Sequence, residues 1–432
     1  MLFSAWGGYP KSDCDFISVD NKSNLSELLN YNKSYIPYGN GRSYGDSALG
    51  DNIIGCRKKN YFISFDKNDG LLHVQAGVLL SEIIEHFVPR GWFPKVVPGT
   101  KLITIGGAIA SDVHGKNHHK EGCFSETVKE LTIMLADGSV VSCDRECTPE
   151  LFKATCGGQG LTGVILDAKI YLKKIYSQYL NQEITKTKNL EETLYTFERY
   201  NETQYSVAWI DCLSKNKGIG KGLFMAGDFC HDGDLNLVNR KTYSVPFKVP
   251  PVLINKWFVK AFNWIYYNKV KSGLVRSKVH LDSFFFPLDS IKNWNRLYGG
   301  KGFIQYQFII PKSQGLSGLK EILSVISEKS KGSPLAVLKM HGKDNGNWLS
   351  FPFEGYSLAI DFKIEKDLFS FLRDLDELVL KYHGRFYLAK DARVSKSVFE
   401  VGYPNIEKFR HFRKVNKMDK KFQSIQSKRI GI

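Results

Sequence analysis

Residues 98–119 read PGTKLITIGGAIASDVHGKNHH, and this glycine-rich stretch decides how the N-terminal part of the chain is interpreted. Because glycine has no Cβ, the pair Gly106-Gly107 lets a bulky ligand approach the backbone closely. Two similar segments flank it, residues 37–46 (PYGNGRSYGD) and residues 157–163 (GGQGLTG). Any one of them fits an ordinary tight turn. Together they predict a site where backbone N–H groups converge on a pyrophosphate-containing ligand.

The third loop formally contains a GxGxxG pattern at Gly158, Gly160 and Gly163. A dinucleotide-binding Rossmann fold needs a strand before this pattern and a helix after it. Here an expected helix at 149–155 precedes the pattern and an expected strand at 164–171 follows it. The order is reversed, so the sequence does not predict a Rossmann fold.

The texture of the whole chain predicts an α+β protein. A chain of 432 residues is too long for one ordinary core, so two domains are expected. Short strands and glycine turns continue to about residue 175, and a more aromatic, lysine-rich region follows to about residue 380. The expected strands are 61–65, 72–76, 128–134, 164–171, 205–211 and 305–310, and the expected helices are 79–87, 149–155, 316–329 and 366–381.

Residues 252–270 predict an amphipathic helix. Its basic face holds Lys256, Lys260 and Tyr267, and its apolar face holds Phe258, Phe262 and Ile265. Such a helix either covers a protein core or lies on a membrane surface, and the sequence leaves both readings open.

Bulk composition narrows the functional classes. The net charge of +16 fits a phosphorylated substrate, an anionic membrane surface or a merely solvated basic surface, and no nucleic-acid-binding motif accompanies it. Eight cysteines without a CxxC pair predict reduced thiols and no zinc site. The sequence shows neither a secretion signal nor a 20-residue apolar span, so we expect a cytoplasmic protein or one peripheral to the inner face of the cell membrane.

Longer motifs give a specific resemblance. GNGRSYGD (39–46), residues 98–119, ELFKATCGGQGLTG (150–163) and FYLAKDAR (386–393) resemble the decaprenylphosphoryl-β-D-ribose 2'-oxidase family. That family belongs to the vanillyl-alcohol-oxidase, or PCMH-type, FAD-binding superfamily. Further similar segments, from WGGYP near the N-terminus through YSVAWIDC and KGFIQYQFIIP, extend the resemblance over almost the whole chain.

The resemblance implies an FAD domain in two parts, residues 1–175 and a C-terminal return at 384–432. An inserted substrate domain, an antiparallel sheet flanked by helices, would occupy residues 176–383. FAD contacts are expected at Pro37, Gly39, Asn40, Gly41, Arg42, Ser43, Tyr44, Gly45, Asp46, Ser47, Gly99, Thr104, Ile105, Gly106, Gly107, Ser111, His114, Val164 and Tyr387.

The linkage to FAD is also implied. Some relatives in the superfamily attach FAD covalently through a histidine in the first loop, and Arg42 occupies the matching place here. Arginine cannot form that bond, so we expect non-covalent FAD, unlike in the lactone and alditol oxidases.

Oxidation of a secondary alcohol needs a group that accepts the hydroxyl proton and a positive charge near the reduced flavin. Lysine suits both tasks, since burial lowers its pKa toward neutrality. By match to the family, Lys390, Lys116 and His114 are the catalytic candidates. The expected substrate-binding residues are Tyr44, Tyr298, Gln307, Lys339 and His118.

The histidines of residues 114–119 also suggest a metal site, since imidazole is a common zinc ligand. No carboxylate or thiolate stands at ligand spacing, and flavin chemistry needs no metal, so we expect none. His114 is expected to pack against the flavin, and His118 and His119 to support the loop or the substrate phosphate.

One stretch departs from the family. Its best-known members carry a cysteine in the strand that here contains Ala359, an asparagine at Ser357 and an aromatic ring at His341. The cofactor motifs are retained while the pocket wall has changed, which leaves the sugar and the lipid undetermined.

The function expected first is oxidation of the 2'-hydroxyl of a polyprenyl-phosphate-linked pentose. With a separate NAD-dependent short-chain reductase this would epimerise the sugar for cell-envelope polysaccharide synthesis. The second expectation is a sugar-1,4-lactone or alditol oxidase that uses oxygen. The third is a flavin-binding protein without catalysis, which the presence of Lys390 disfavours.

Overall fold

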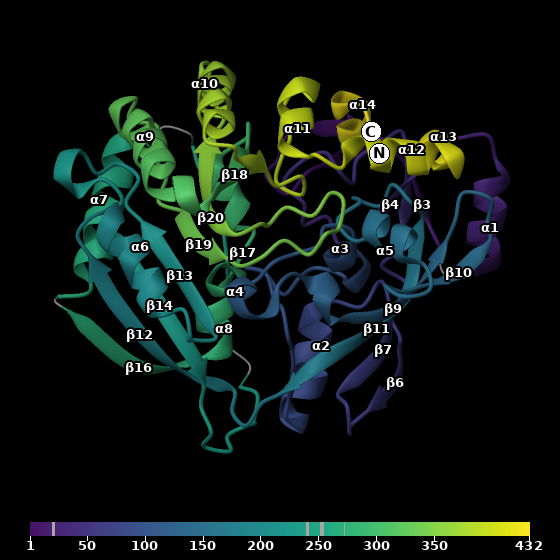
Figure 1. Cartoon of the computed structure of the whole chain (residues 1–432), viewed down its shortest axis with the longest axis horizontal. Helices are drawn as coiled ribbons and strands as arrows, with labels where there is room; N and C mark the ends of the chain where they lie inside the picture. The colour runs from purple at the N-terminus through teal and green to yellow at the C-terminus, as the bar shows by residue number, and fades with distance from the viewer. Residues whose placement is uncertain (20–21, 239–241, 251–254, 272) are drawn as a thin grey trace.

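The computed structural model describes residues 1–432 except 20–21, 239–241, 251–254 and 272. It places two sheet-containing halves side by side, with the N-terminal half at the right of Figure 1 and the middle of the chain at the left. The C-terminal helices, in yellow, return to lie over the N-terminal half. The chain therefore has the α+β architecture that its sequence predicts.

The N-terminal half holds an antiparallel sheet, here called the N-terminal sheet, in the order β10-β9-β11-β7-β6, with β8 paired to β11. The N-terminal half also contains a parallel sheet of order β3-β5-β4 and the antiparallel pair β1-β2. The strands are β1 (Leu2–Ser4), β2 (Lys11–Asp13), β3 (Asp15–Ser18), β4 (Ile36–Tyr38), β5 (Asn52–Gly55), β6 (Phe62–Asp66), β7 (Leu71–Gln75), β8 (Trp92–Pro94), β9 (Val128–Met134), β10 (Val140–Cys143) and β11 (Val164–Lys174).

Short helices connect these strands. They are α1 (Lys22–Asn30), α2 (Leu80–Phe87), α3 (Ile105–Ala110), α4 (His118–Glu121) and α5 (Pro149–Thr155). Helix α5 ends before Gly158 and strand β11 begins at Val164, so the prediction that the GxGxxG pattern is not a Rossmann fingerprint is confirmed.

The middle of the chain forms a second antiparallel sheet, the central sheet, in the order β16-β12-β14-β13-β19-β20-β18-β21. Its strands are β12 (Tyr179–Thr187), β13 (Tyr205–Ile210), β14 (Gly222–Phe229), β16 (Leu274–His280), β18 (Phe303–Pro311), β19 (Ala336–His341), β20 (Gly355–Lys363) and β21 (Arg385–Phe386). A short parallel pair, β15 (Tyr243–Ser244) with β17 (Ile291–Lys292), lies outside it.

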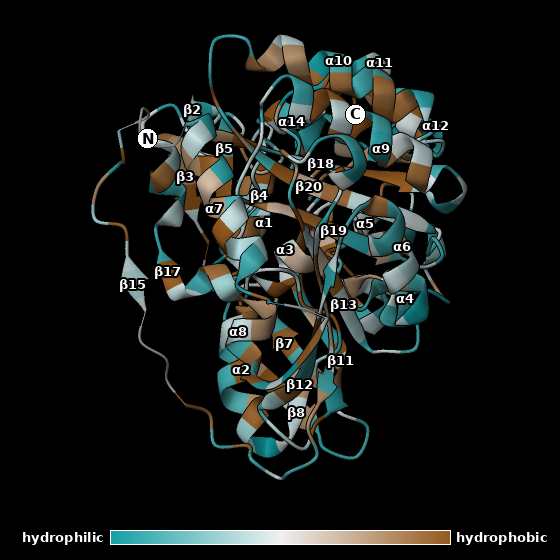
Figure 2. Ribbon diagram, turned by 90° about the vertical axis from the view of Figure 1, so that its left-hand side faces the viewer, coloured by the Kyte–Doolittle hydropathy of each residue, from teal (hydrophilic) through white to brown (hydrophobic). Residues whose placement is uncertain are grey.

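Helices cover one face of the central sheet. They are α6 (Leu190–Arg199), α9 (Gly315–Glu328) and α10 (Leu368–Lys381), and their apolar residues pack in the main core against residues such as Phe224 and Leu358. Figure 2 shows the amphipathic pattern, with brown hydrophobic and teal hydrophilic residues alternating along these helices. The opposite face of the sheet is left to line a cavity.

Helix α7 (Lys256–Asn268) lies in the region where the sequence predicts an amphipathic helix, and residues 252–254 of that prediction are outside the described part of the chain. The residues that it buries are Val259 and Asn263, whereas Phe258 and Ile265 are 47% and 63% exposed. The predicted apolar face therefore does not cover a core. The following helix α8 (Leu281–Phe285) instead inserts phenyl rings against the N-terminal half.

The last part of the chain passes from β21 over the first glycine loop. Its helices are α11 (Lys396–Gly402), α12 (Ile406–Val415), α13 (Met418–Lys421) and α14 (Ile425–Ile430). The backbone N–H of Tyr44 donates to the carbonyl of Ala389 at 3.0 Å, and that of Ile425 donates to Leu49 at 2.7 Å. Segments more than 300 residues apart in sequence thus form one wall. Among the described residues no helix is long and apolar enough to cross a membrane.

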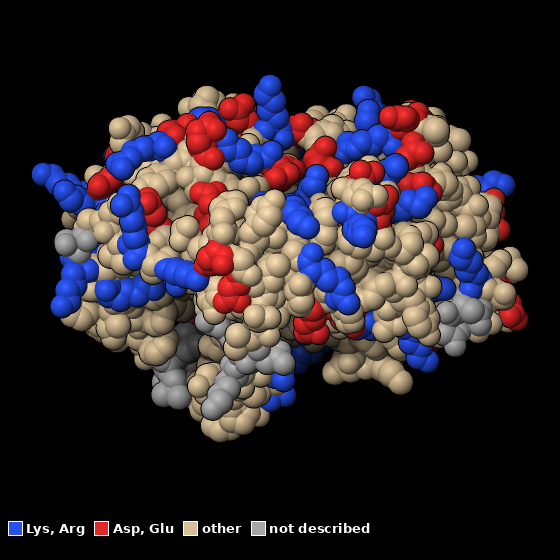
Figure 3. Space-filling view, turned by 90° about the horizontal axis from the view of Figure 1, so that it is seen from below, with Lys and Arg blue, Asp and Glu red and all other residues tan. Residues whose placement is uncertain are grey.

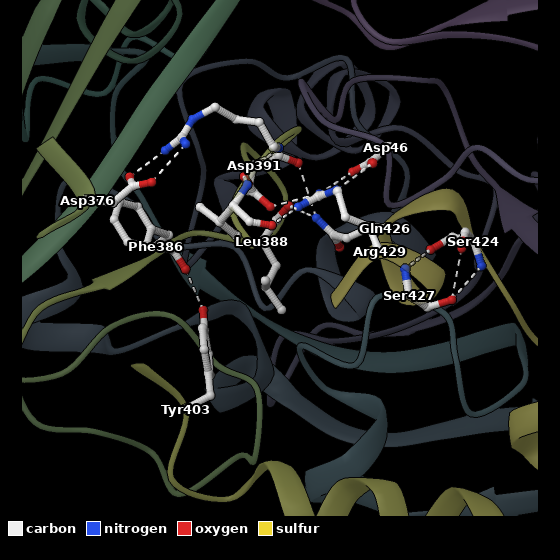
Figure 4. Close-up of polar contacts among 12 residues, drawn as sticks. Asp46, Asp376, Phe386, Leu388, Asp391, Tyr403, Ser424, Gln426, Ser427 and Arg429 are labelled. Carbon is white, nitrogen blue, oxygen red and sulfur yellow. Dashed lines mark hydrogen bonds and ion pairs between the residues drawn. The ribbon is translucent and has the colours of Figure 1, made fainter. Parts of the chain in front are cut away.

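Buried polar contacts fix this return, as Figure 4 shows. Arg429 lies between the carboxylates of Asp46 in the first glycine loop and Asp391, at 2.7 and 2.9 Å. Gln426 donates to the carbonyl of Leu388 at 2.8 Å, and Tyr403 donates to that of Phe386 at 2.6 Å. These contacts hold the backbone on both sides of residue 390.

Candidate active site

A cavity of about 530 Å³ lies between the glycine loops and the free face of the central sheet. All three glycine-rich segments of the sequence contribute to its lining, together with strands of the central sheet and the C-terminal return. The expected cofactor residues that line it are Pro37, Gly39, Asn40, Gly41, Arg42, Ser43, Tyr44, Ser47, Gly99, Thr104, Gly106, Gly107, Ser111, His114 and Tyr387.

The glycines of the first loop are required by close packing. A Cβ added at Gly39 would lie 2.3 Å from Thr104 Oγ1, and one at Gly45 would lie 1.7 Å from the carbonyl oxygen of Asp391. Gly41 has a φ of +60°, which L-residues with a side chain rarely adopt. The first loop is thus pressed against both the second loop and the C-terminal return.

Polar contacts join the first and second loops. Asn40 Nδ2 donates to the carbonyl of Leu102 at 2.8 Å. Thr104 caps helix α3, because its Oγ1 accepts from the backbone N–H of Gly107 at 3.1 Å. At Gly99 the opposite situation holds, since an added Cβ would meet no heavy atom within 4 Å and the backbone there faces open space.

Four expected cofactor residues lie just behind the cavity wall. Gly45 packs on Asp391, and Asp46 pairs with Arg429. Ile105 and Val164 are fully buried in hydrophobic clusters, and the neighbours Gly163 and Ile165 line the cavity in place of Val164.

The residues present fit a flavin dinucleotide. Glycine backbones form a close-fitting wall, and two buried nitrogens, Arg42 Nε and His114 Nδ1, have no hydrogen-bond partner among the described residues. The Arg42 guanidinium also stacks over the ring of Trp6 at 4.0 Å. A half-buried guanidinium beside glycine amides suits a pyrophosphate, and a cavity of this size suits a planar ring system.

The central sheet supplies the other wall through alternate residues of neighbouring strands, since side chains alternate across a strand. Gln307 of β18 pairs with Ala359 of β20, which pairs with Val337 of β19. Two residues further along β19, Lys339 pairs with Ser357 of β20. Ala359 sits in the middle of this wall, so a residue at that position touches whatever occupies the cavity.

Three lysines face the cavity: Lys116, Lys339 and Lys390. Burial lowers the pKa of Lys116 and Lys390 to about 7 and that of Lys339 to about 8. Lys116 Nζ donates to the carbonyl of Phe284, and Lys390 Nζ lies 3.7 Å from the ring centre of Tyr44. The cavity therefore concentrates groups that bind an anion or exchange a proton near neutral pH.

Asp361 is a buried carboxyl that sequence reasoning did not select. Burial raises its pKa to about 7, while Gln305, Lys390 and Tyr298 favour its charged form. Gln305 Nε2 donates to its Oδ1 at 2.7 Å, and Tyr298 donates to its Oδ2 at 3.5 Å. The available signal was that Asp361 is the one acid in the mostly apolar stretch 356–362. Asp361 is placed to tune the charge of Lys390.

The histidines form a buried cluster next to this wall. His114 lines the cavity, where its Nε2 lies 3.0 Å from Gln307 Nε2. His341 packs between the rings of His114 and His118, each 4.8 Å away, and contacts Ser357 Oγ at 2.7 Å. Burial lowers the pKa of all three imidazoles, that of His118 to about 3, so they are neutral at pH 7.

Two expected substrate residues do not line the cavity. His118 accepts from the backbone N–H of Gly342 at 3.1 Å and lies behind His341. Tyr298 stacks on Phe303 at 4.3 Å behind Tyr44. Among the described residues, no group of three or more His, Cys, Asp and Glu could hold a metal ion.

Similarities to known proteins agree with this geometry. Residues 17–144 match the family described as FAD binding domain. Over 419 residues the chain is 35% identical to the decaprenylphosphoryl-beta-D-ribose oxidase of Mycolicibacterium smegmatis, which covers 93% of this chain and 90% of that relative.

Similarity to lactone oxidases is shorter. The putative D-arabinono-1,4-lactone oxidase of Neurospora crassa is 31% identical over 156 residues, 36% of this chain and 27% of that protein. The L-gulonolactone oxidase of Mus musculus is 32% identical over 136 residues, 31% of each chain. The mycobacterial relative is thus matched along almost its whole length and these two over about a third or less.

Proposed function

The chain belongs to the decaprenylphosphoryl-β-D-ribose oxidase family, and on that premise we propose that it oxidises the 2'-hydroxyl of a pentose linked to a polyprenyl phosphate. It is an FAD-dependent oxidoreductase that acts on a sugar alcohol. The proposal concerns the position of the hydroxyl, the pentose and the lipid phosphate.

One observation carries the proposal: three lysines face the same cavity that the glycine loops line. Burial lowers the pKa of all three lysines, so their charged forms are costly in this cavity unless an anion enters with them. A sugar phosphodiester brings such an anion, whereas a neutral lactone or polyol does not. Lys116 and Lys339 are the residues that we assign to the phosphate, with Gln307 as a hydrogen-bonding partner for the sugar.

Bound FAD supplies the acceptor for the hydride that leaves the carbinol carbon. The hydroxyl proton is transferred to Lys390 Nζ, because a pKa of about 7 leaves this amine partly neutral at physiological pH. Once protonated, Lys390 places a positive charge in the cavity where negative charge collects. Asp361 stabilises that cation from behind, and the packed rings of Tyr44 and Tyr387 exclude water.

The product is a keto sugar, and its reduction from the opposite face would complete an epimerisation. We assign that step to a separate NAD-dependent short-chain reductase, in a route to cell-envelope polysaccharide. A polyprenyl substrate resides in a membrane, so we also propose that the protein works at a membrane surface.

Anaerobic flavin bleaching tests the substrate. Holoprotein mixed with polyprenyl-phosphoryl ribose is expected to lose the yellow colour of oxidised flavin within one turnover. Free sugar lactones and alditols are expected to leave the colour unchanged. Bleaching by a lactone and not by the lipid-linked sugar would transfer the assignment to the lactone oxidases.

The linkage of FAD is tested separately. Because Arg42 cannot form the covalent bond, acid precipitation should leave the yellow colour in the supernatant. Colour that stays in the protein pellet would show a covalent bond elsewhere in the chain.

A further inference from the structure

A long basic segment surrounds helix α7. Between residues 235 and 281 the sequence contains no Asp or Glu, whereas it contains nine Lys or Arg. Lys256, Lys260 and Lys269 lie on or next to α7 and are exposed. Figure 3 shows many basic side chains along the left end of the molecule, the end where α7 and β16 lie in Figure 1. This region is built to meet an anionic partner.

The same helix exposes large apolar side chains. Trp257 and Trp264 are each 67% exposed, Ile265 is 63% exposed and Phe258 is 47% exposed. Every other tryptophan of the chain is at least half buried. Tryptophan beside lysine on an amphipathic helix is the composition that binds at the boundary between lipid headgroups and acyl chains.

The inner side of helix α7 is packed against the protein. Its outer face is therefore exposed in a well-packed helix and not because the helix is detached from the core. Val259 and Asn263 are 3% and 1% exposed, and Asn263 Nδ2 donates to Asp211 Oδ1 at 2.7 Å. Tyr267 donates its hydroxyl to the carbonyl of Thr187 at 3.0 Å. The helix therefore presents a fixed apolar and basic face to the outside.

The helix also borders the cavity. Phe262 and Tyr266 line it, and Tyr266 packs on Trp209 of β13 with ring centres 4.8 Å apart. Phe258, Phe262 and Tyr266 form a row of near-parallel rings with centres 6.5 and 5.8 Å apart. This row leads from the exposed face of α7 to the cavity lining.

We propose that α7 is an interfacial helix that docks the protein on an anionic lipid bilayer, with Trp257 and Trp264 inserted among the headgroups. The row of rings from Phe258 to Tyr266 would then guide a polyprenyl chain from the bilayer into the cavity, a step that rests on the proposed function. The lysines of α7 supply the attraction to anionic lipid. The exposed tryptophans favour a lipid surface over an acidic protein, because a partner bound by charge alone would leave them unexplained.

Vesicle flotation with the holoprotein tests the docking. Vesicles of phosphatidylcholine with about one third phosphatidylglycerol should bind the protein at low salt, and pure phosphatidylcholine vesicles should bind it at least about tenfold more weakly. The variants W257S/W264S and K256Q/K260Q should each weaken binding to the anionic vesicles by roughly tenfold or more. The double variant Y31S/Y61S, which removes two exposed rings from the N-terminal half, should bind like the wild type.

A second readout separates this inference from the enzyme assignment. None of the four replaced positions on α7 lines the cavity, so W257S/W264S should bleach with a short-chain, water-soluble prenyl-phosphoryl pentose at the wild-type rate without vesicles. Vesicle binding through α7 without any bleaching would uphold the docking and overturn the function. Normal bleaching with no vesicle binding, or α7-dependent binding to a protein alone, would overturn the docking.

Discussion

The loops that line one side of the cavity and the sheet that lines the other differ in how they tolerate change. In the loops a single methyl group at Gly39 would overlap Thr104, and the carboxylate of Asp46 is buried against Arg429. On the sheet, Ala359 projects from a regular strand into open space, so its replacement alters the cavity without moving the backbone. The binding site therefore separates into a rigid cofactor side and an adjustable substrate side.

This difference accounts for the pattern of retained and changed residues. By the sequence resemblance, the glycine motifs of the three loops match the family, whereas Ala359, Ser357 and His341 are expected to differ from it. Backbone packing constrains the glycines, whereas Ser357 and Ala359 line the cavity and His341 packs behind it between two other imidazole rings.

Lys390 belongs to both sides of the site, because its backbone lies in the rigid C-terminal return while its side chain faces the cavity. Lys390→Ala should lower the rate of flavin reduction about 10²- to 10⁴-fold, the usual contribution of a general base. FAD content should stay near the wild-type value, because the backbone of Tyr44 in the first loop is held by the carbonyl of Ala389 and not by the Lys390 side chain. Stopped-flow bleaching with Lys408→Ala as a surface control measures both, and a fully active K390A would remove Lys390 from the mechanism.

Arg429 tests the rigidity of the cofactor side. Arg429→Ala leaves Asp46 and Asp391 buried without their cation, so the free energy of unfolding should fall by about 3–5 kcal/mol. Arg410 offers a matched control on α12, since it pairs with Glu400 and the exposed Glu407, and Arg410→Ala should cost about 1 kcal/mol or less. Urea unfolding of both variants decides between them. Equal losses would show that the return is held by its apolar contacts instead.

Asp361 should set the pH dependence. If neutral Lys390 is the base, the rate of flavin reduction rises with pH around a midpoint near 7. The charge of Asp361 raises the pKa of Lys390, so Asp361→Asn should lower that pKa and move the midpoint to lower pH. Bleaching rates measured over about two pH units on each side of neutrality test this, and a midpoint that moves upward would contradict the coupling.

The adjustable wall should give the smallest effects on catalysis. Inhibitors that bond the cysteine of related proteins should not label this chain at the strand of Ala359, while Ala359→Cys should gain one label per chain with its FAD content unchanged. His341→Phe removes the hydrogen bond to Ser357. Because one hydrogen bond contributes about 1 kcal/mol, KM should change by a few-fold. Mass spectrometry detects the adduct, and an adduct on the wild-type strand would refute the alignment at this position.

Sequence reasoning found the elements with strong local signals. The strands 128–134 and 164–171 and the helix 149–155 lie where alternation and the Thr148-Pro149 start predict them. The lining of the cavity by the three glycine loops agrees with the sequence as well. These features depend on residues that are neighbours in the chain.

The features that sequence reasoning missed depend on pairing between distant segments. Whether Asp361 lies behind Lys390 depends on the register of β18 against β20, which places Gln305 opposite it. The position of His118 behind His341 depends on packing between α4 and β19. The sequence left open whether the apolar face of α7 covers a core or faces outward, because periodicity shows that the two faces of a helix differ but not which of them meets the protein.

The measurement that tests the central claim most directly is a flavin titration of the purified chain. The purified protein is expected to be yellow and to hold one FAD per chain, and the apoprotein is expected to regain the same stoichiometry when FAD is added. The variant Gly39→Val, whose side chain would overlap Thr104 where the first and second loops meet, should lose FAD binding. A correctly folded wild-type protein that is colourless and takes up no FAD would contradict the assignment of the glycine-lined cavity to FAD.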